Sequence, residues 1–395
     1  MVFATWPIWL PLALVSLLLR TWVSYKRRQW LKKTGHILLE IKIPKNTDKS
    51  PAAMEMVLEG IWEDVIGSLT GAYLEGEVRD VFSLEIVSLG GQVKFFIWAF
   101  PKWKSIIESR IYTHYPGAEV VEAEDYATKV VFDPKTMNLS GITTRLHKPD
   151  AYPIKTYIDF ELDKGNKEQE EIVDPLAPIL EYLGTLKPGE NQWIQILLQG
   201  HRKEGFQDIR LFSKPDWREG IKKEIKKIIE KEAIIEPEMG KPPSMFNLTA
   251  AQTDTIKAIE RNAAKLAFDT MWRMVYIAPK EISVGRTVGI VGAMRQFSSR
   301  TLLNALRPHK FIPGIQYPWE DFLDITKTYR QRALLEAYKR RSVFNVPFRH
   351  VFGKPYVLTT EELATLFHFP GTTVTTPTLT RVSSKKAEAP SNLPM

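Results

Sequence analysis

Apolar positions in the first third of the chain recur with the alternating periods of strands and helices. Two strand-like runs flank Gly90-Gly91, which is the pattern of a tight hairpin. Ser50-Pro51 opens a helix, since Ser is a preferred N-cap and Pro is accepted in the first turn. The predicted elements are strand 37–43, helix 50–69, strands 81–89 and 93–99, helix 103–114 and strand 118–123. This βαββαβ order predicts a ferredoxin-like unit.

A second set of elements follows a segment, 125–154, whose Pro and Gly residues indicate loops. Thr249 and Gln252 form a capping-box sequence ahead of a long helical stripe. The predicted elements are strand 155–162, helix 174–186, strand 192–199, the helix from 249, strand 273–278 and helix 283–306. With residues 201–248 taken as a helical insertion, the order is again close to βαββαβ.

The predicted fold class is therefore α+β, with a transmembrane helix, two tandem ferredoxin-like units and an extended C-terminal tail. The tail prediction rests on residues 371–395, which are rich in Thr, Ser and Pro and typical of extended linkers. The predicted domains are the anchor 1–33, the first unit with its linker 34–150, the interrupted second unit 151–350, and the C-terminal strand, helix and tail 351–395.

The N-terminal nineteen residues carry no charge, and a one-sided basic collar follows them. An apolar run of about this length predicts a transmembrane helix with the lipid bilayer as partner. The positive-inside rule then places the N-terminus outside and the remainder in the cytoplasm, as in a single-pass protein of the cytoplasmic membrane. A buried N-terminal helix is the alternative. The collar residues are Arg20, Lys26, Arg27, Arg28, Lys32 and Lys33.

The remainder of the chain is close to electroneutral. The net charge is +8, and the collar supplies six of these charges, which leaves +2 for residues 34–395. A nearly neutral body is weak evidence for a general nucleic-acid-binding protein. The absence of cysteine excludes disulfides, thiolate zinc sites and cysteine nucleophiles, and it is typical of a reducing compartment.

Two helices in the body are rich in charge. In helix 216–233 lysines and glutamates alternate at i,i+4 spacing, which favours a solvated and self-paired face. Helix 321–344 is mostly basic after its first turn, and it is the candidate surface for nucleic acid or an acidic partner; a basic surface helix without a ligand is the alternative. Its candidate residues are Lys327, Arg330, Arg332, Lys339, Arg340 and Arg341.

Motifs for catalysis are missing from the sequence. The glycines of residues 284–293 lack the Lys-Ser/Thr pair of a Walker A loop. The seven histidines do not occur at metal-binding spacings, and no G-x-S-x-G elbow occurs. The sequence therefore predicts a non-enzymatic protein with no cofactor and no bound metal, although carboxylate catalysis leaves no sequence signature that would exclude it.

Three segments carry a resemblance to a known family. They are LTTEELATLFHFPG at 358–371 with the following TTP and SKKAEAPSNLP, KSPAAME at 49–55 with SLEIVS at 83–88, and NQWIQI at 191–196. These segments resemble the region upstream of the P-loop motor in TraD-like (HerA-type) coupling ATPases of type IV secretion, which are frequent in Patescibacteria (candidate phyla radiation). The chain ends where such a motor would begin, so the resemblance implies no ATP hydrolysis here.

The resulting hypothesis is a membrane-anchored, non-enzymatic accessory module of a conjugative DNA-transfer system. The resemblance implies as partners a P-loop ATPase or other secretion-system subunits, DNA held through backbone contacts, and further copies of the chain. Two alternatives remain: a membrane-tethered scaffold that binds only protein, and an enzyme of unknown reaction.

Overall fold

The computed structural model describes most of the chain. The described residues are 6–44, 49–65, 67–163, 174–203, 216–232, 248–280, 287–299, 302–315, 317–371 and 381–382. Most of the predicted tail 371–395 and much of the predicted insertion 201–248 lie outside these residues; of the tail, residues 371 and 381–382 are described.

Helices and strands alternate along the described part. The α-helices are α1 (Trp6–Thr34), α2 (Ala52–Gly60), α3 (Lys104–His114), α4 (Ala177–Gly184), α5 (Trp217–Glu232), α6 (Ala250–Ala263), α7 (Thr287–Met294), α8 (Ile325–Lys339) and α9 (Thr360–Leu366). The strands are β1 (Ile37–Pro44), β2 (Phe82–Leu89), β3 (Gln92–Ala99), β4 (Glu119–Glu122), β5 (Met137–Leu146), β6 (Asn191–Gly200), β7 (Ala267–Pro279), β8 (Leu306–Ile312), β9 (Tyr356–Thr359) and β10 (Arg381–Val382). Short single-turn helices are η2 (Gly71–Glu75), η3 (Pro101–Trp103), η8 (Arg295–Phe297) and η9 (Pro318–Glu320).

The described strands join in one sheet. Its first half has the strand order β4-β1-β3-β2, and its second half has the order β6-β7-β5-β8. The halves meet where β2 pairs antiparallel with β6, for example Ile86 opposite Ile194. Strand β9 pairs with β7, and the two-residue β10 pairs parallel with β1. Because both central strands are buried along nearly their whole length, the two halves share one hydrophobic core.

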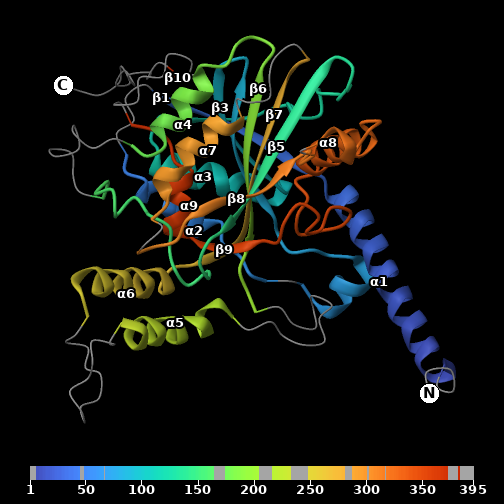
Figure 1. The fold of residues 1–395 in the computed structure, drawn as a ribbon, viewed down its shortest axis with the longest axis horizontal. Coiled ribbons are helices and arrows are strands. Elements are labelled where there is room, and N and C mark those ends of the chain that lie inside the picture. The colour runs from blue at the N-terminus through green and yellow to red at the C-terminus, as the bar shows by residue number, and fades with distance from the viewer. Residues whose placement is uncertain are drawn as a thin grey trace, which may run out of the picture.

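Helices cover the sheet unequally on its two sides. Figure 1 shows α2, α3, α4, α7 and α9 on one side of the strands, and α8 and α1 on the other. Helices α5 and α6 pack on each other at the edge of the molecule. The second half of α1 is docked, because Val23 is buried and the Trp30 ring meets Phe100 edge-on at 5.5 Å. The first half of α1 extends away from the body.

The predicted second unit was wrong in several elements. Residues 155–162 form turns instead of a strand, and the predicted linker contains β5. Gly141 suggested a loop, but the β5 backbone needs it: a Cβ there would lie 2.6 Å from the carbonyl oxygen of Met274. The predicted helix 283–306 ends at Phe297 and is followed by strand β8.

The predicted transmembrane anchor was also wrong. Among the described residues, no helix combines the length and the apolarity needed to cross a bilayer. The uncharged part of α1 ends at Leu19, and from Trp6 it spans only about 21 Å at 1.5 Å per residue. This is shorter than a hydrocarbon core of ~30 Å. The predicted fold class and the predicted single-pass localisation in the cytoplasmic membrane are therefore corrected.

A buried ion pair connects the C-terminal helix α9 to the start of α4. The His368 Nε2 lies 3.1 Å from both carboxylate oxygens of Asp174, and its Nδ1 lies 2.9 Å from the Ala364 carbonyl oxygen. Burial alone would lower the pKa of His368, but the charge and hydrogen bond of Asp174 raise it. The same pair lowers the pKa of Asp174 against the opposing effect of burial.

This pair predicts a pH dependence of stability. Because the folded pKa of His368 is raised, its contribution is complete below the unfolded value of 6.5 and is lost as pH rises through the folded value. His368→Gln should therefore reduce the free energy of unfolding most near pH 6 and progressively less toward pH 9. Each unit of pKa shift corresponds to about 1.4 kcal/mol. Urea titrations of both proteins across this range test it, and a difference independent of pH would contradict it.

Candidate functional site: a basic cleft between two helices

The predicted basic residues of α8 are only partly available for a ligand. Lys327 Nζ lies 3.2 Å from Asp324, and Arg330 donates to the carbonyl of Pro313 at 2.9 Å. Arg332 is exposed and has no ionic or hydrogen-bond partner among the described residues. Lys339 and Arg340 share one acid, Glu336, at 3.8 and 3.6 Å. The end of α8 therefore keeps a net positive charge.

Arg341 is not part of this exposed surface. It directly follows the C-cap of α8, with a positive φ of 46°, and its side chain is fully buried. Its guanidinium donates to both carboxylate oxygens of Glu85, at 3.0 and 3.1 Å, and also to Asp125. Burial would lower the pKa of Arg341, but Glu85 and Asp125 raise it well above its usual value. A phosphate would have to displace these carboxylates, so Arg341 is a structural residue.

A polar network continues from this ion pair across the centre of the sheet. Glu85 of β2 also accepts hydrogen bonds from Tyr126 and from Gln195 of β6, both at 2.7 Å. Gln195 in turn accepts from Arg273 of β7 at 2.6 Å. Burial lowers the pKa of Arg273 to about 9. These hydrogen bonds link the adjacent strands β2, β6 and β7 with Arg341 at the end of α8. The network therefore fixes the end of α8 on the sheet.

A cleft of about 810 Å³ lies beside this network, between the ends of α1 and α8. Its cationic lining comes from both helices: Arg28 and Lys32 from α1, and Lys339 and Arg340 from α8. Glu336 is the acidic side chain in the lining. Arg341 also borders the cleft, but Glu85 and Asp125 neutralise it. The other four cations against one carboxylate give the cleft a positive character, in a protein whose body is otherwise near neutrality.

Aromatic rings form the other walls of the cleft. Trp98 and Phe100 come from the end of β3, and Phe344 and Phe348 come from the loop after α8. The indole N–H of Trp98 is buried and has no acceptor among the described residues. An unsatisfied buried donor is uncommon in folded proteins. The cleft thus combines cations for phosphate or carboxylate groups with flat apolar surfaces.

The predicted collar is divided by the docking of α1. Arg28 and Lys32 line the cleft, whereas Arg20 lies on the exposed first half of the helix. Lys26 lies over the Trp22 ring at 5.1 Å, next to the contact of α1 with η2. The structure therefore brings two collar residues together with two residues of the predicted basic helix, which the sequence treated as separate surfaces.

Comparison with known families identifies the family of this chain. A family model described as a domain of unknown function, DUF8128, matches residues 21–381. This chain belongs to the DUF8128 family. The match includes both helices of the cleft and begins after the apolar first part of α1. A comparison with curated proteins found no match.

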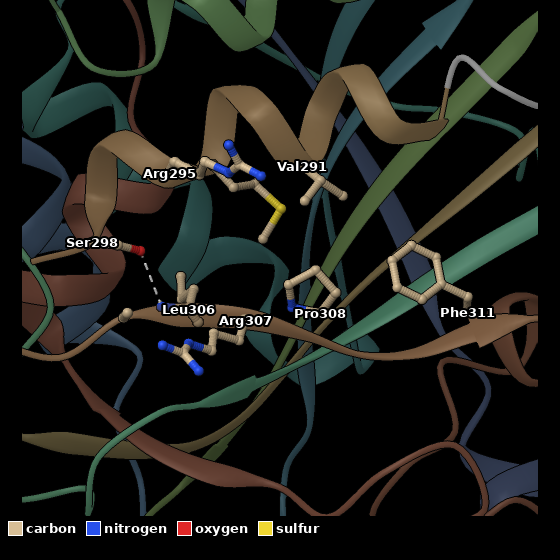
Figure 2. Close-up of a pocket in the computed structure, with 9 residues that line it drawn as sticks. Val291, Arg295, Ser298, Leu306, Arg307, Pro308 and Phe311 are labelled. Carbon is tan, nitrogen blue, oxygen red and sulfur yellow. Dashed lines mark hydrogen bonds between the residues drawn. The ribbon is translucent and has the colours of Figure 1, made fainter. Parts of the chain in front are cut away.

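A second cavity of this DUF8128 domain, of about 890 Å³, lies between α7, η8 and the edge strand β8. Figure 2 shows Val291 and Arg295 on the helical wall, with Leu306, Pro308 and Phe311 along the strand. Ser298 Oγ accepts the backbone N–H of Leu306 at 3.2 Å and closes one end. Arg307 points away from Arg295, so their charges do not converge on one ligand position.

Metal-binding side chains do not gather in the described part of the DUF8128 domain. Within the part of the chain that the structure describes, no three His, Asp or Glu side chains are arranged to hold an ion. The cleft was missed at the sequence level because its walls come from residues about three hundred positions apart. One feature of the sequence did point to the network beside the cleft. Glu85 is the one charged residue in strand β2, and a buried carboxylate requires a cationic or hydrogen-bonding partner.

Proposed function

We propose that this protein is a non-enzymatic binding module that holds the phosphate backbone of a nucleic acid in the basic cleft. The observation that carries the proposal is the convergence of Arg28, Lys32, Lys339 and Arg340 from two helices on one cleft. Phosphate contacts supply most of the sequence-independent affinity of nucleic-acid-binding proteins. The aromatic walls add surfaces on which bases or sugars can pack.

The resemblance of residues 358–371 to the region upstream of TraD-like motors suggests the biological setting. In this proposal the module serves a DNA-transfer machinery, where it guides DNA toward a P-loop ATPase or toward other subunits. The residues of the cleft hold the DNA strand in position, and the module catalyses no reaction on the DNA.

Binding is expected to be weak, indifferent to sequence and steeply dependent on salt. With four phosphate contacts, the slope of log K against log salt concentration should be about −3 to −4. Fluorescence anisotropy with labelled single- and double-stranded oligonucleotides measures it. Replacing Arg28, Lys32, Lys339 and Arg340 together by Gln should lower the affinity at least about tenfold, and each substitution should flatten the slope by about one.

The matched control is the basic face of α5. Lys226 and Lys227 are also exposed, but they are paired with Glu230 and Glu224 at 3.4 and 2.6 Å. Replacing these two lysines by Gln should leave affinity and salt slope nearly unchanged. An equal fall in affinity from both sets would mean that only overall charge matters, and absence of binding by the unmodified protein at low salt would refute the proposal.

A further inference from the structure

The end of β8, the loop after it and the first turns of α8 expose large apolar side chains, here named together the aromatic patch. Phe322 is 90% exposed and Trp319 is 75% exposed, and Trp319 stacks in parallel on Tyr317 with ring centroids 4.7 Å apart. The patch consists of Phe311, Tyr317, Trp319, Phe322, Leu323, Ile325 and Tyr329. Large apolar side chains exposed in this number on one segment indicate an interaction site in folded proteins.

The patch is held in place by the start of α8. The carboxylate of Asp321 accepts the backbone N–H groups of Ile325 and Lys327, at 3.0 and 2.7 Å. Arg330 reaches back from α8 to the carbonyl of Pro313 and fixes the other end of the loop. The aromatic side chains are thus presented on an anchored surface, which lowers the entropic cost of binding.

The exposed first half of α1 is a second apolar surface without a cover in the described structure. Its exposed side chains include Leu12, Leu14, Val15, Leu17, Leu18, Leu19 and Trp22. A helix that is apolar all round is normally buried against another element. In Figure 1 this half of α1 lies apart from the start of α8, so the helix does not cover the patch of its own chain.

The two surfaces are complementary in charge as well as in apolarity. The segment from Phe311 to Tyr329, which bears the patch, contains three acidic residues, Glu320, Asp321 and Asp324, against one basic residue, Lys327. The exposed half of α1 carries one basic residue, Arg20, and no acidic one; the other basic residues of α1 lie in its docked half. Opposite signs at the border of an interface select the partner and the orientation. A second copy of the chain therefore offers each surface its complement: its patch for the helix, and its helix for the patch.

We propose that the exposed half of α1 of one copy docks on the aromatic patch of another copy. The contact joins two different surfaces, so it is heterologous: each copy uses its helix toward one neighbour and its patch toward the next. Such contacts generate closed rings or open filaments instead of simple dimers. The proposal is independent of nucleic-acid binding, because the patch and the cleft involve different residues.

The test uses the full chain and two variants that each remove one surface. Trp319→Ser with Phe322→Ser removes the patch, and Leu17→Ser with Leu18→Ser removes the helix surface. Each variant should associate at least about tenfold more weakly than the unmodified chain in light scattering coupled to size-exclusion chromatography. The control Val131→Ser changes a side chain that is 76% exposed but lies outside both surfaces, and it should associate normally.

Mixing the two variants gives the decisive result. The patch-deficient variant keeps its helix, and the helix-deficient variant keeps its patch, so one intact interface remains and the mixture should form one-to-one dimers that grow no further. Three results would overturn the proposal: a monomeric unmodified chain, no dimer on mixing, or association that the helix substitutions abolish while the patch substitutions leave it unchanged. Sedimentation with lipid vesicles of neutral composition is run in parallel, and helix-dependent binding to vesicles without self-association would also overturn it.

Discussion

Replacing Arg341 by methionine is expected to destabilise the protein by about 3–5 kcal/mol, the usual cost of breaking a buried ion pair by removing one partner. The substitution preserves most of the side-chain volume but leaves Glu85 and Asp125 without the cation that compensates them. Glu85 is fully buried in the middle of the sheet, so water cannot replace the missing guanidinium. Urea denaturation followed by circular dichroism measures the change in stability.

Arg340→Met is the matched control for this result. It changes the same residue type one position earlier, where the side chain is 60% exposed and lies 3.6 Å from Glu336. Exposed pairs of this kind contribute at most about 1 kcal/mol, so this variant should unfold at nearly the same urea concentration as the unmodified protein. Similar shifts for both variants would show that Arg341 does not hold the sheet and α8 together.

The second large effect is expected at Gly76, where the chain passes directly under α1. Its φ of +81° is unfavourable for other residues, and a Cβ there would lie 2.3 Å from the carbonyl carbon of Lys26. Gly76→Ala should therefore displace the docked half of α1, in addition to a conformational cost of about 1–2 kcal/mol. With Arg28 and Lys32 displaced, nucleic-acid affinity should fall as far as in the double substitution of those two residues.

Gly117→Ala separates backbone strain from the clash with α1. Gly117 has a similar φ of +85°, but a Cβ there would make only ordinary contacts with Pro44 at 3.6 Å. This control should lose stability without losing affinity. Hydrogen exchange over residues 23–34 should rise in the Gly76 variant alone; unchanged protection there would mean that α1 is not seated on this glycine.

Local patterns predicted several elements because they depend on neighbouring residues. The Gly90-Gly91 turn predicted a hairpin, and β2 and β3 pair across it. The capping box predicted at Thr249 with Gln252 is present at the start of α6. Strand β5 was missed because Gly141 is required by the distant Met274 backbone, which a local pattern does not contain.

The candidate site was less predictable for the same reason. A run of basic residues marked α8, but periodicity did not distinguish the buried Arg341 from the exposed Arg340 beside it. Their difference follows from the end of the helix, where Arg340 has helical φ and ψ and Arg341 has a positive φ that points it inward. The convergence of α1 and α8 on one cleft depends on the whole sheet between them.

The most direct test of the central claim is lysine footprinting of the protein with and without DNA, read by mass spectrometry. If the cleft holds a phosphate backbone, Lys32 and Lys339 should become protected from acylation at saturating DNA, while Lys226 and Lys257 keep their reactivity. The latter two are exposed lysines of α5 and α6, distant in the chain from the cleft. Protection that spreads equally over all four lysines, or that spares Lys32 and Lys339, would contradict a binding site in the cleft.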